Sequence, residues 1–318
     1  MNDKQINKWL RRRFTEVGWV LVVYYGIMNI LAAVTMAVDA ARQMLWAFVN
    51  GDFSSMIDMD AIAGNAWGYI LTIVVGVVIL HAWKGGDYWK SEILVKGNKM
   101  TPKVLLCVLC FCAGSQMVNG IWVGFLEVIL NQFGMSAMNV LESVSGDSDT
   151  FSMFLYASLL APIAEEVLFR GYILRSLRPF GKRFAVFGSA FLFGLFHGNL
   201  LQTPYAFLMG LVLGYVAVEY SIHWAVFLHM FNNLVLADLL TRLTANLPEM
   251  ALCILNLVIF GGAAVASAII LVKKRREVRE YNRSEWMDRR VLKCFFTNSG
   301  VIVLTVIMVI NIILMLFV

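Results

Sequence analysis

Long apolar runs alternate with short polar stretches along the whole chain. A helix of about 20 apolar residues crosses the hydrocarbon core of a bilayer, so each run predicts a membrane-spanning helix. The segment 40–60 is too polar to span, and Trp46 and Phe48 favour a place at the membrane interface for part of it. The predicted spans, of which the fifth to seventh are short, are 15–38, 61–83, 104–130, 151–177, 184–200, 205–220, 222–240, 250–272 and 299–318. The pattern therefore predicts an all-α polytopic membrane bundle of eight or nine transmembrane helices, in which residues 1–318 form a single integral membrane domain.

The composition agrees with a bilayer as the main solvent. Hydrophobic residues make up 60% of the 318 residues and charged residues 15%, whereas soluble domains carry about 25% charged residues. The five cysteines are odd in number and lie mostly inside apolar runs, which argues against a disulfide framework.

The basic residues are concentrated in four segments that nine alternating spans would place on one side of the membrane. Segments 1–13, 84–103, 175–183 and 273–293 hold 23 of the 26 lysines and arginines. Because basic loops stay on the cytoplasmic side, the N-terminus is predicted to be cytoplasmic and the protein to be a multi-pass protein of the cell membrane. The most basic segment, 273–293, is interpreted as an anchor at anionic lipid headgroups, and no nucleic-acid partner is expected. The sequence favours no particular oligomeric state.

Ionisable side chains inside the fourth span are the strongest functional signal. The stretch "APIAEEVLFRG", residues 161–171, places Glu165, Glu166 and Arg170 in an apolar segment. Charges within a membrane are costly and usually mark a functional site. Glu166 and Arg170 are four residues apart and are predicted to form an ion pair on one helix face. Glu165 is then left without a partner on its own helix.

Two deep histidines and an asparagine complete a predicted cluster. His197 ends the sequence "FGLFH", and His229 and Asn233 lie one helical turn apart in "HMFNN". At 1.5 Å per residue, these side chains and Glu165 lie about 10–20 Å from the cytoplasmic ends of their spans. We therefore predict that they meet inside the membrane. The alternative is that each polar group only hydrogen-bonds one helix to another.

Such a cluster suits peptide hydrolysis without a covalent intermediate. Glu165 is the candidate general base that takes a proton from a trapped water, and His197 would fix the position of that water. Donors from His229 and Asn233 would stabilise the oxyanion formed on the substrate carbonyl. The competing mechanism uses Zn²⁺ held by the two histidines and a glutamate, although the spacing does not resemble H-E-x-x-H. The metal-free mechanism is preferred, so no cofactor is expected.

The three motifs resemble those of the CPBP family, the CAAX-prenyl-protease and bacteriocin-processing group of intramembrane proteases, also called the Abi family. The family pattern is E-E-x-x-x-R, then F-x-x-x-H, then H-x-x-x-N, and each part occurs here in order on separate spans. The resemblance covers about residues 150–240, which would form the catalytic core. It implies a helical bundle with an active site open toward the cytoplasm. It assigns Glu165 as the base, Glu166 and Arg170 as an ion pair, His197 to the water, and His229 and Asn233 to the oxyanion.

The expected function is that of an intramembrane endopeptidase acting on a peptide or membrane-associated protein. Two alternatives belong to other classes: a non-catalytic scaffold or immunity protein of the same fold, and a transporter that uses Glu165 as a proton relay. Family members commonly have about eight spans, so the ninth predicted helix would be an addition.

Polar and small residues elsewhere in the spans are interpreted as packing features. Gly210 and Gly214 form a G-x-x-x-G pattern that predicts close contact between helices. Gln116 and Asn119 are expected to bond neighbouring helices or to border the cavity.

Overall fold

The computed structural model describes residues 3–51, 57–137, 150–284 and 288–317, and within these ranges the chain is helical and contains no strand. The bounds are α1 Asp3–Asn50, α2 Met59–Ala63, α3 Trp67–Tyr88, η1 Trp89–Ile93, α4 Pro102–Asn131, α6 Phe151–Phe154, η2 Leu155–Leu160, α7 Ala161–Glu166, η3 Val167–Leu174, α8 Arg175–Leu177, η4 Arg178–Phe180, α9 Lys182–Phe196, α10 Gln202–Glu219, α11 Ile222–Met230, η5 Phe231–Leu239, α12 Leu240–Thr244, α13 Glu249–Asn256, η6 Leu257–Gly261, α14 Gly262–Lys273, α15 Arg275–Ser284, α16 Arg289–Phe296 and α17 Ser299–Met315. Every predicted span corresponds to one of these helices or helical runs, which confirms the all-α membrane bundle.

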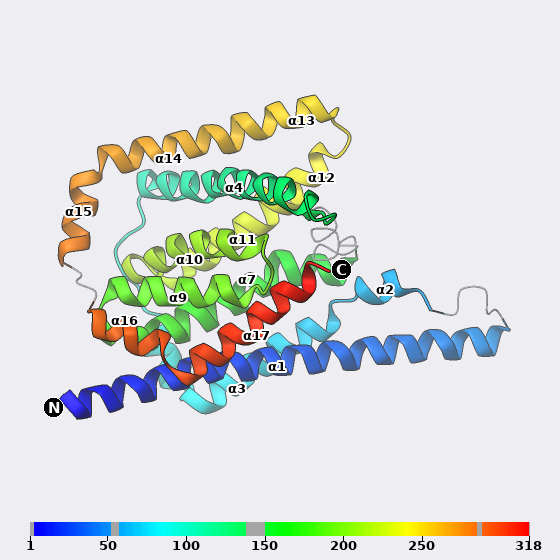
Figure 1. The fold of residues 1–318 in the computed structure, drawn as a ribbon, viewed down its shortest axis with the longest axis horizontal. Coiled ribbons are helices and arrows are strands. Elements are labelled where there is room, and N and C mark those ends of the chain that lie inside the picture. The colour runs from blue at the N-terminus through cyan, green and yellow to red at the C-terminus, as the bar shows by residue number, and fades with distance from the viewer. Residues whose placement is uncertain (1–2, 52–56, 138–149, 285–287, 318) are drawn as a thin grey trace.

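The long helices run back and forth between two ends of the molecule (Figure 1). The N-terminus, the start of α4, the start of α9 and all of α15 lie at the same end, and the C-terminus lies toward the other. The four basic segments identified in the sequence are therefore gathered at one end of the bundle. This arrangement is the one that the positive-inside rule requires of a multi-pass protein.

The number of helices that could cross a membrane is smaller than the number of predicted spans. Among the described residues six helices are long and apolar enough to cross a membrane. The number is seven if α16 and α17, which meet at 57°, count as one bent span. The predicted spans 184–200 and 205–220 form α9 and α10, which do not pass this test. At 15 residues, α9 is about 22 Å long. Both helices lie among neighbouring helices in the interior, so protein rather than lipid covers their apolar faces (Figure 1).

The first helix is longer than the sequence predicted. The expected span ended at residue 38, but α1 continues to Asn50, for 48 residues in all. No proline or glycine interrupts residues 27–50, and the helix stops only before Gly51, whose positive φ of 66° suits a helix end. In Figure 1 the distal part of α1 extends beyond the other helices. The interfacial segment predicted at 40–60 is therefore helical as far as Asn50, and residues 52–56 lie outside the described ranges.

Residues Phe151–Phe180 form one continuous helical run, here called the motif helix, which carries Glu165, Glu166 and Arg170. Its path includes two π-helical stretches, η2 and η3. Pro162 lacks a backbone N–H and cannot continue the usual hydrogen bonding of an α-helix, which accounts for the irregular turn before it. Local π-helical geometry of this kind often accompanies functional sites.

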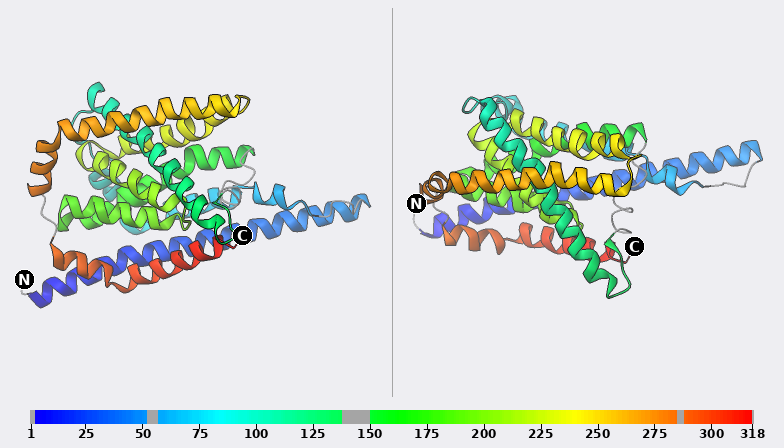
Figure 2. Two further views of the ribbon diagram at one scale, coloured as in Figure 1. Left: turned by 45° about the horizontal axis from the view of Figure 1, so that its top comes forward. Right: turned by 90° about the horizontal axis from the view of Figure 1, so that it is seen from above.

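Glycines bring α9 and α10 into close contact behind the motif helix. A Cβ atom added to Gly210 would come within 2.9 Å of the Cα of Ala190, and one on Gly214 within 3.2 Å of Val186. The predicted packing role of the G-x-x-x-G pattern is confirmed. Helix α17 packs along α1, and the two lie side by side in Figures 1 and 2.

Candidate active site

The predicted ion pair of the motif helix is present and completely buried. Arg170 Nη1 lies 2.9 Å from Glu166 Oε1, and neither side chain is exposed. The guanidinium group of Arg170 also stacks over the ring of Phe193, at 4.3 Å from the ring centroid, and its Nη2 donates to the carbonyl of Gly210 at 3.4 Å. Several partners are needed to offset the desolvation of a buried charge. Arg170 thus links the motif helix to both α9 and α10.

His229 on α11 connects the two glutamates. Its Nδ1 lies 2.9 Å from Glu166 Oε1, and its Nε2 lies 3.7 Å from Glu165 Oε2. A carboxylate accepts hydrogen bonds, so Nδ1 carries a proton and donates to Glu166. In a neutral imidazole Nε2 then has a lone pair and accepts; only in the charged form does it donate. The contact with Glu166 is a feature that the sequence did not predict.

His197 sits at the C-terminal end of α9, in the turn that reverses the chain toward α10. Its Nδ1 donates to the carbonyl of Phe193 at 2.8 Å, which leaves Nε2 free to accept. The next residue, Gly198, has a positive φ of 63°, a conformation that ends helices and favours glycine. Asn311 of α17 donates to the Gly198 carbonyl at 2.9 Å. The C-terminal helix therefore braces the turn that orients His197.

Replacing Gly198 by alanine is expected to strain this turn and to move His197. The new Cβ would require a left-handed backbone at a non-glycine residue and would lie 2.8 Å from Asn311 Nδ2. We expect a loss of stability of about 1–2 kcal/mol, together with a fall in the peptide-cleaving activity that the sequence predicts. Unfolding in mixed detergent micelles and cleavage rates measure the two effects. Gly120→Ala on α4, where nothing lies within 4 Å, is the matched control; equal behaviour of the two variants contradicts the prediction.

Asn233 forms one hydrogen bond to the motif helix and one with its neighbour in the chain. Its Nδ2 donates to the carbonyl of Ala157 on the motif helix at 3.0 Å, and its Oδ1 accepts from Asn232 at 3.0 Å. Asn232 in turn accepts from the hydroxyl of Tyr205 at 2.8 Å and from Gln116 at 3.1 Å. Gln116 thus bonds neighbouring helices as predicted. The sequence prediction missed Asn232 and Tyr205, although a second intramembrane asparagine in "HMFNN" was a visible signal.

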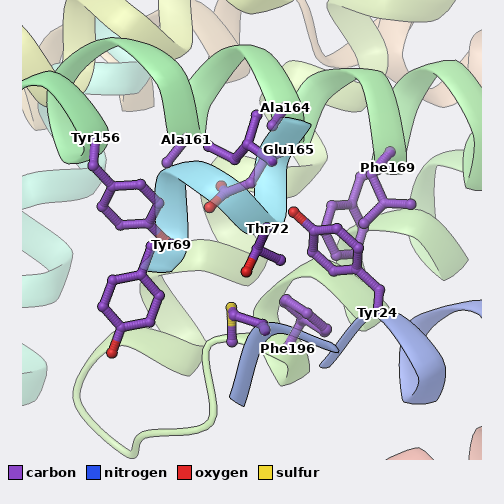
Figure 3. A pocket seen from close by; sticks show the side chains of 12 residues that line it. Tyr24, Tyr69, Thr72, Tyr156, Ala161, Ala164, Glu165, Phe169 and Phe196 are labelled. Carbon is purple, nitrogen blue, oxygen red and sulfur yellow. The ribbon is translucent and has the colours of Figure 1, made fainter. Parts of the chain in front are cut away.

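Glu165 faces a pocket instead of forming an ion pair on its own helix. Its side chain is 29% exposed, and Figure 3 shows its carboxylate directed into the space between the motif helix, α1 and α3. The pocket is lined by Tyr24, Met28, Tyr69, Thr72, Ile73, Tyr156, Ala161, Ala164, Glu165, Leu168, Phe169 and Phe196. Glu165 is the one charged side chain in this lining. The first helices of the chain, which carry no motif, supply much of the wall.

The histidine and acidic side chains of the site are the candidate ligands for a metal ion. Among the described residues, no group of three or more His, Cys, Asp and Glu side chains is arranged to hold a metal. Glu166 is engaged with Arg170 and with His229 Nδ1. The other candidate ligands, Glu165 and the Nε2 atoms of His197 and His229, do not form such a group either, so the arrangement does not fit a zinc site of two histidines and a glutamate.

Comparison with known protein families gives a match for the segment that carries the three motifs. Residues 147–235 match the family described as "Type II CAAX prenyl endopeptidase Rce1-like". This segment is similar to that family. The match confirms the resemblance drawn from the three motifs and supports a membrane protease. No match is found among curated proteins or among solved structures.

The Rce1-like segment contains all six predicted site residues. Four of them are in direct contact: Glu165, Glu166, Arg170 and His229. The remaining two, His197 and Asn233, are held by backbone carbonyls of α9 and the motif helix. Together with the helices that are long and apolar enough to cross a membrane, the match supports a multi-pass membrane protein with a segment similar to a membrane protease family.

Proposed function

We propose that the protein is an intramembrane endopeptidase in which Glu165 is the general base. One observation carries the proposal: Glu165 opens onto a pocket, whereas the charge of Glu166 is balanced by Arg170 and His229. Two adjacent glutamates therefore occupy different environments. The balanced one suits a structural role, and the other is available to accept a proton.

In the proposed reaction Glu165 removes a proton from a water molecule while the water oxygen attacks the carbonyl carbon of a peptide bond. The electron pair of the carbonyl moves to its oxygen, giving a tetrahedral oxyanion. Glu165 then delivers the proton to the amide nitrogen as the C–N bond breaks, and a carboxyl and an amine terminus are released. His197 Nε2 would accept a hydrogen bond from the water and thereby orient it.

The roles of His229 and Asn233 depend on their present hydrogen bonds. His229 could stabilise the oxyanion through Nε2 only in its charged form, because its other nitrogen donates to Glu166. Asn233 would have to release the Ala157 carbonyl before its amide could donate to substrate. We therefore assign oxyanion stabilisation to His229 in its charged form. Asn233 is assigned to the positioning of the motif helix through its hydrogen bond to the Ala157 carbonyl. When substrate binds, the Asn233 amide would release that carbonyl and donate to the substrate.

The proposed substrate is a peptide or a membrane-associated protein that enters from the basic, cytoplasmic end of the bundle. The basic segments there would lie among anionic headgroups of the cell membrane. The family description names prenyl endopeptidases, so peptides with and without a prenylated cysteine are both appropriate probes.

The test is peptide cleavage by the purified wild-type protein, with its metal content measured on the same sample. We expect cleavage of quenched peptides in detergent to continue at an unchanged rate after treatment with a zinc chelator, since the histidine and carboxylate side chains of the described residues are not arranged to hold a metal. Stoichiometric zinc whose removal abolishes cleavage would overturn the metal-free mechanism. A protein that cleaves none of the peptides would favour the non-catalytic scaffold.

A further inference from the structure

The pocket beside Glu165 contains hydroxyl groups that no motif includes. Its polar lining consists of the Glu165 carboxylate and the hydroxyls of Tyr24, Tyr69, Thr72 and Tyr156. Hydroxyl groups are hydrogen-bond donors, and a reacting carbonyl oxygen needs donors as negative charge develops on it. A substrate carbonyl attacked by water held at Glu165 would lie in this space. The question is which hydroxyl is free to reach it.

The donors assigned from the motifs are largely engaged elsewhere. Asn233 donates to the carbonyl of Ala157, and one nitrogen of His229 donates to Glu166. Among the hydroxyls, Thr72 donates to the carbonyl of Gly68 at 2.9 Å. A hydroxyl has one proton to donate, so Thr72 is also committed. The oxyanion therefore needs a further hydrogen-bond donor besides those that the motifs provide.

Tyr24 of α1 meets this need. Figure 3 shows its phenolic oxygen directed toward the Glu165 side of the pocket, whereas the oxygen of Tyr69 points to the far side. Among the described residues the Tyr24 hydroxyl has no hydrogen-bond partner. It is also not sealed inside the protein, because it lines the open space of the pocket. A donor that is held in place and unoccupied costs no reorganisation when substrate arrives.

The ring of Tyr24 is held from two sides. A Cβ atom on Gly76 of α3 would come within 2.5 Å of Tyr24 Cε2, so the missing side chain at Gly76 makes room for the ring. On the other side the ring of Phe196 lies 6.0 Å from that of Tyr24, centroid to centroid. Phe196 directly precedes His197 in the chain. Tyr24 and His197 are thus positioned by the same local packing.

We propose that Tyr24 is a catalytic residue whose hydroxyl donates a hydrogen bond to the substrate carbonyl oxygen and stabilises the oxyanion. The inference rests on the proposed endopeptidase function. It places one part of the catalytic machinery on α1, outside residues 147–235 that match the family. With His229 Nε2 as the second donor, the oxyanion would be bound by groups from two helices that are distant in the sequence.

Tyr24→Phe removes the hydroxyl and keeps the ring. We expect kcat for the most rapidly cleaved quenched peptide to fall by about 100-fold, because removing one oxyanion donor typically costs 10²–10³, while KM changes little. Tyr69→Phe is the matched control, with a hydroxyl in the same pocket that points away from Glu165. A peptide aldehyde, whose hydrate resembles the tetrahedral intermediate, should lose affinity for Tyr24→Phe by a similar factor.

Other outcomes separate this inference from the proposed function. Tyr24→Phe with kcat within threefold of wild type, or with a loss equal to that of Tyr69→Phe, would remove Tyr24 from the mechanism and leave the endopeptidase intact. Gly76→Ala is a second variant that retains the hydroxyl and displaces the ring; unchanged kcat in that variant also counts against the inference. A wild-type protein that cleaves no peptide rejects both proposals together.

Discussion

Replacement of Glu165 by glutamine is expected to lower kcat for peptide cleavage by about 10³-fold, within the usual range for loss of a general base. Glutamine has nearly the same shape as glutamate but takes no proton from water. The side chain is 29% exposed, and His229 Nε2 lies 3.7 Å from its carboxylate. The substitution therefore leaves the buried contacts of Glu166 and Arg170 in place. Stability should change little while catalysis is lost.

The measurement uses wild-type protein and Glu165→Gln purified in the same detergent, with single-turnover cleavage of a quenched peptide. Glu16→Gln is a suitable control, because Glu16 is also partly exposed and bonded, here to Lys84 and Tyr172, but does not line the pocket. The control should retain wild-type kcat. Glu165→Gln with more than a tenth of wild-type kcat would show that another group activates the water.

The ion pair and the helices were predictable because the information for them is local. Glu166 and Arg170 are neighbours on any helical path, so four-residue spacing was sufficient. Apolar runs likewise located every long helix. The predicted span ended at residue 38, whereas α1 continues to Asn50, because low apolar content marks where a helix leaves the membrane and not where the helix stops. Gly51 was the residue that marked the helix end.

The interactions between helices could not be read in the same way. Spacing places His229 and Asn233 on one face of their helix, but it does not say which group each side chain meets on the next helix. The rotation of α11 and η5 relative to the motif helix determines these contacts. It places His229 beside Glu166 and Asn233 beside the Ala157 carbonyl. Side-chain packing between the helices sets this rotation. Tyr24 was overlooked for the same reason, because nothing within α1 indicates what lies opposite it.

The buried pair also makes a strong prediction about stability. Arg170→Met should destabilise the fold by about 3–5 kcal/mol, because it leaves the Glu166 carboxylate buried without its main counter-charge. The contact with His229 Nδ1 remains but is a single hydrogen bond. Unfolding in mixed detergent micelles gives the magnitude. Arg242→Met is the control, since Arg242 also pairs with an acidic residue four positions away, Asp238, but is 44% exposed. That variant should lose less than about 1 kcal/mol.

Combining Arg170→Met with Glu166→Gln separates structure from catalysis. Glu166 Oε2 and Arg170 Nε have no hydrogen-bond partner among the described residues, so the charges are incompletely compensated even when paired. A neutral pair of similar volume should therefore return stability to within about 1 kcal/mol of wild type. Activity should stay low, because His229 Nδ1 would then face an amide that holds its proton less strongly than a carboxylate. A double variant that regains both stability and wild-type kcat would mean that Glu166 and Arg170 only hold the helices together, and that His229 needs neither of them to act on the substrate.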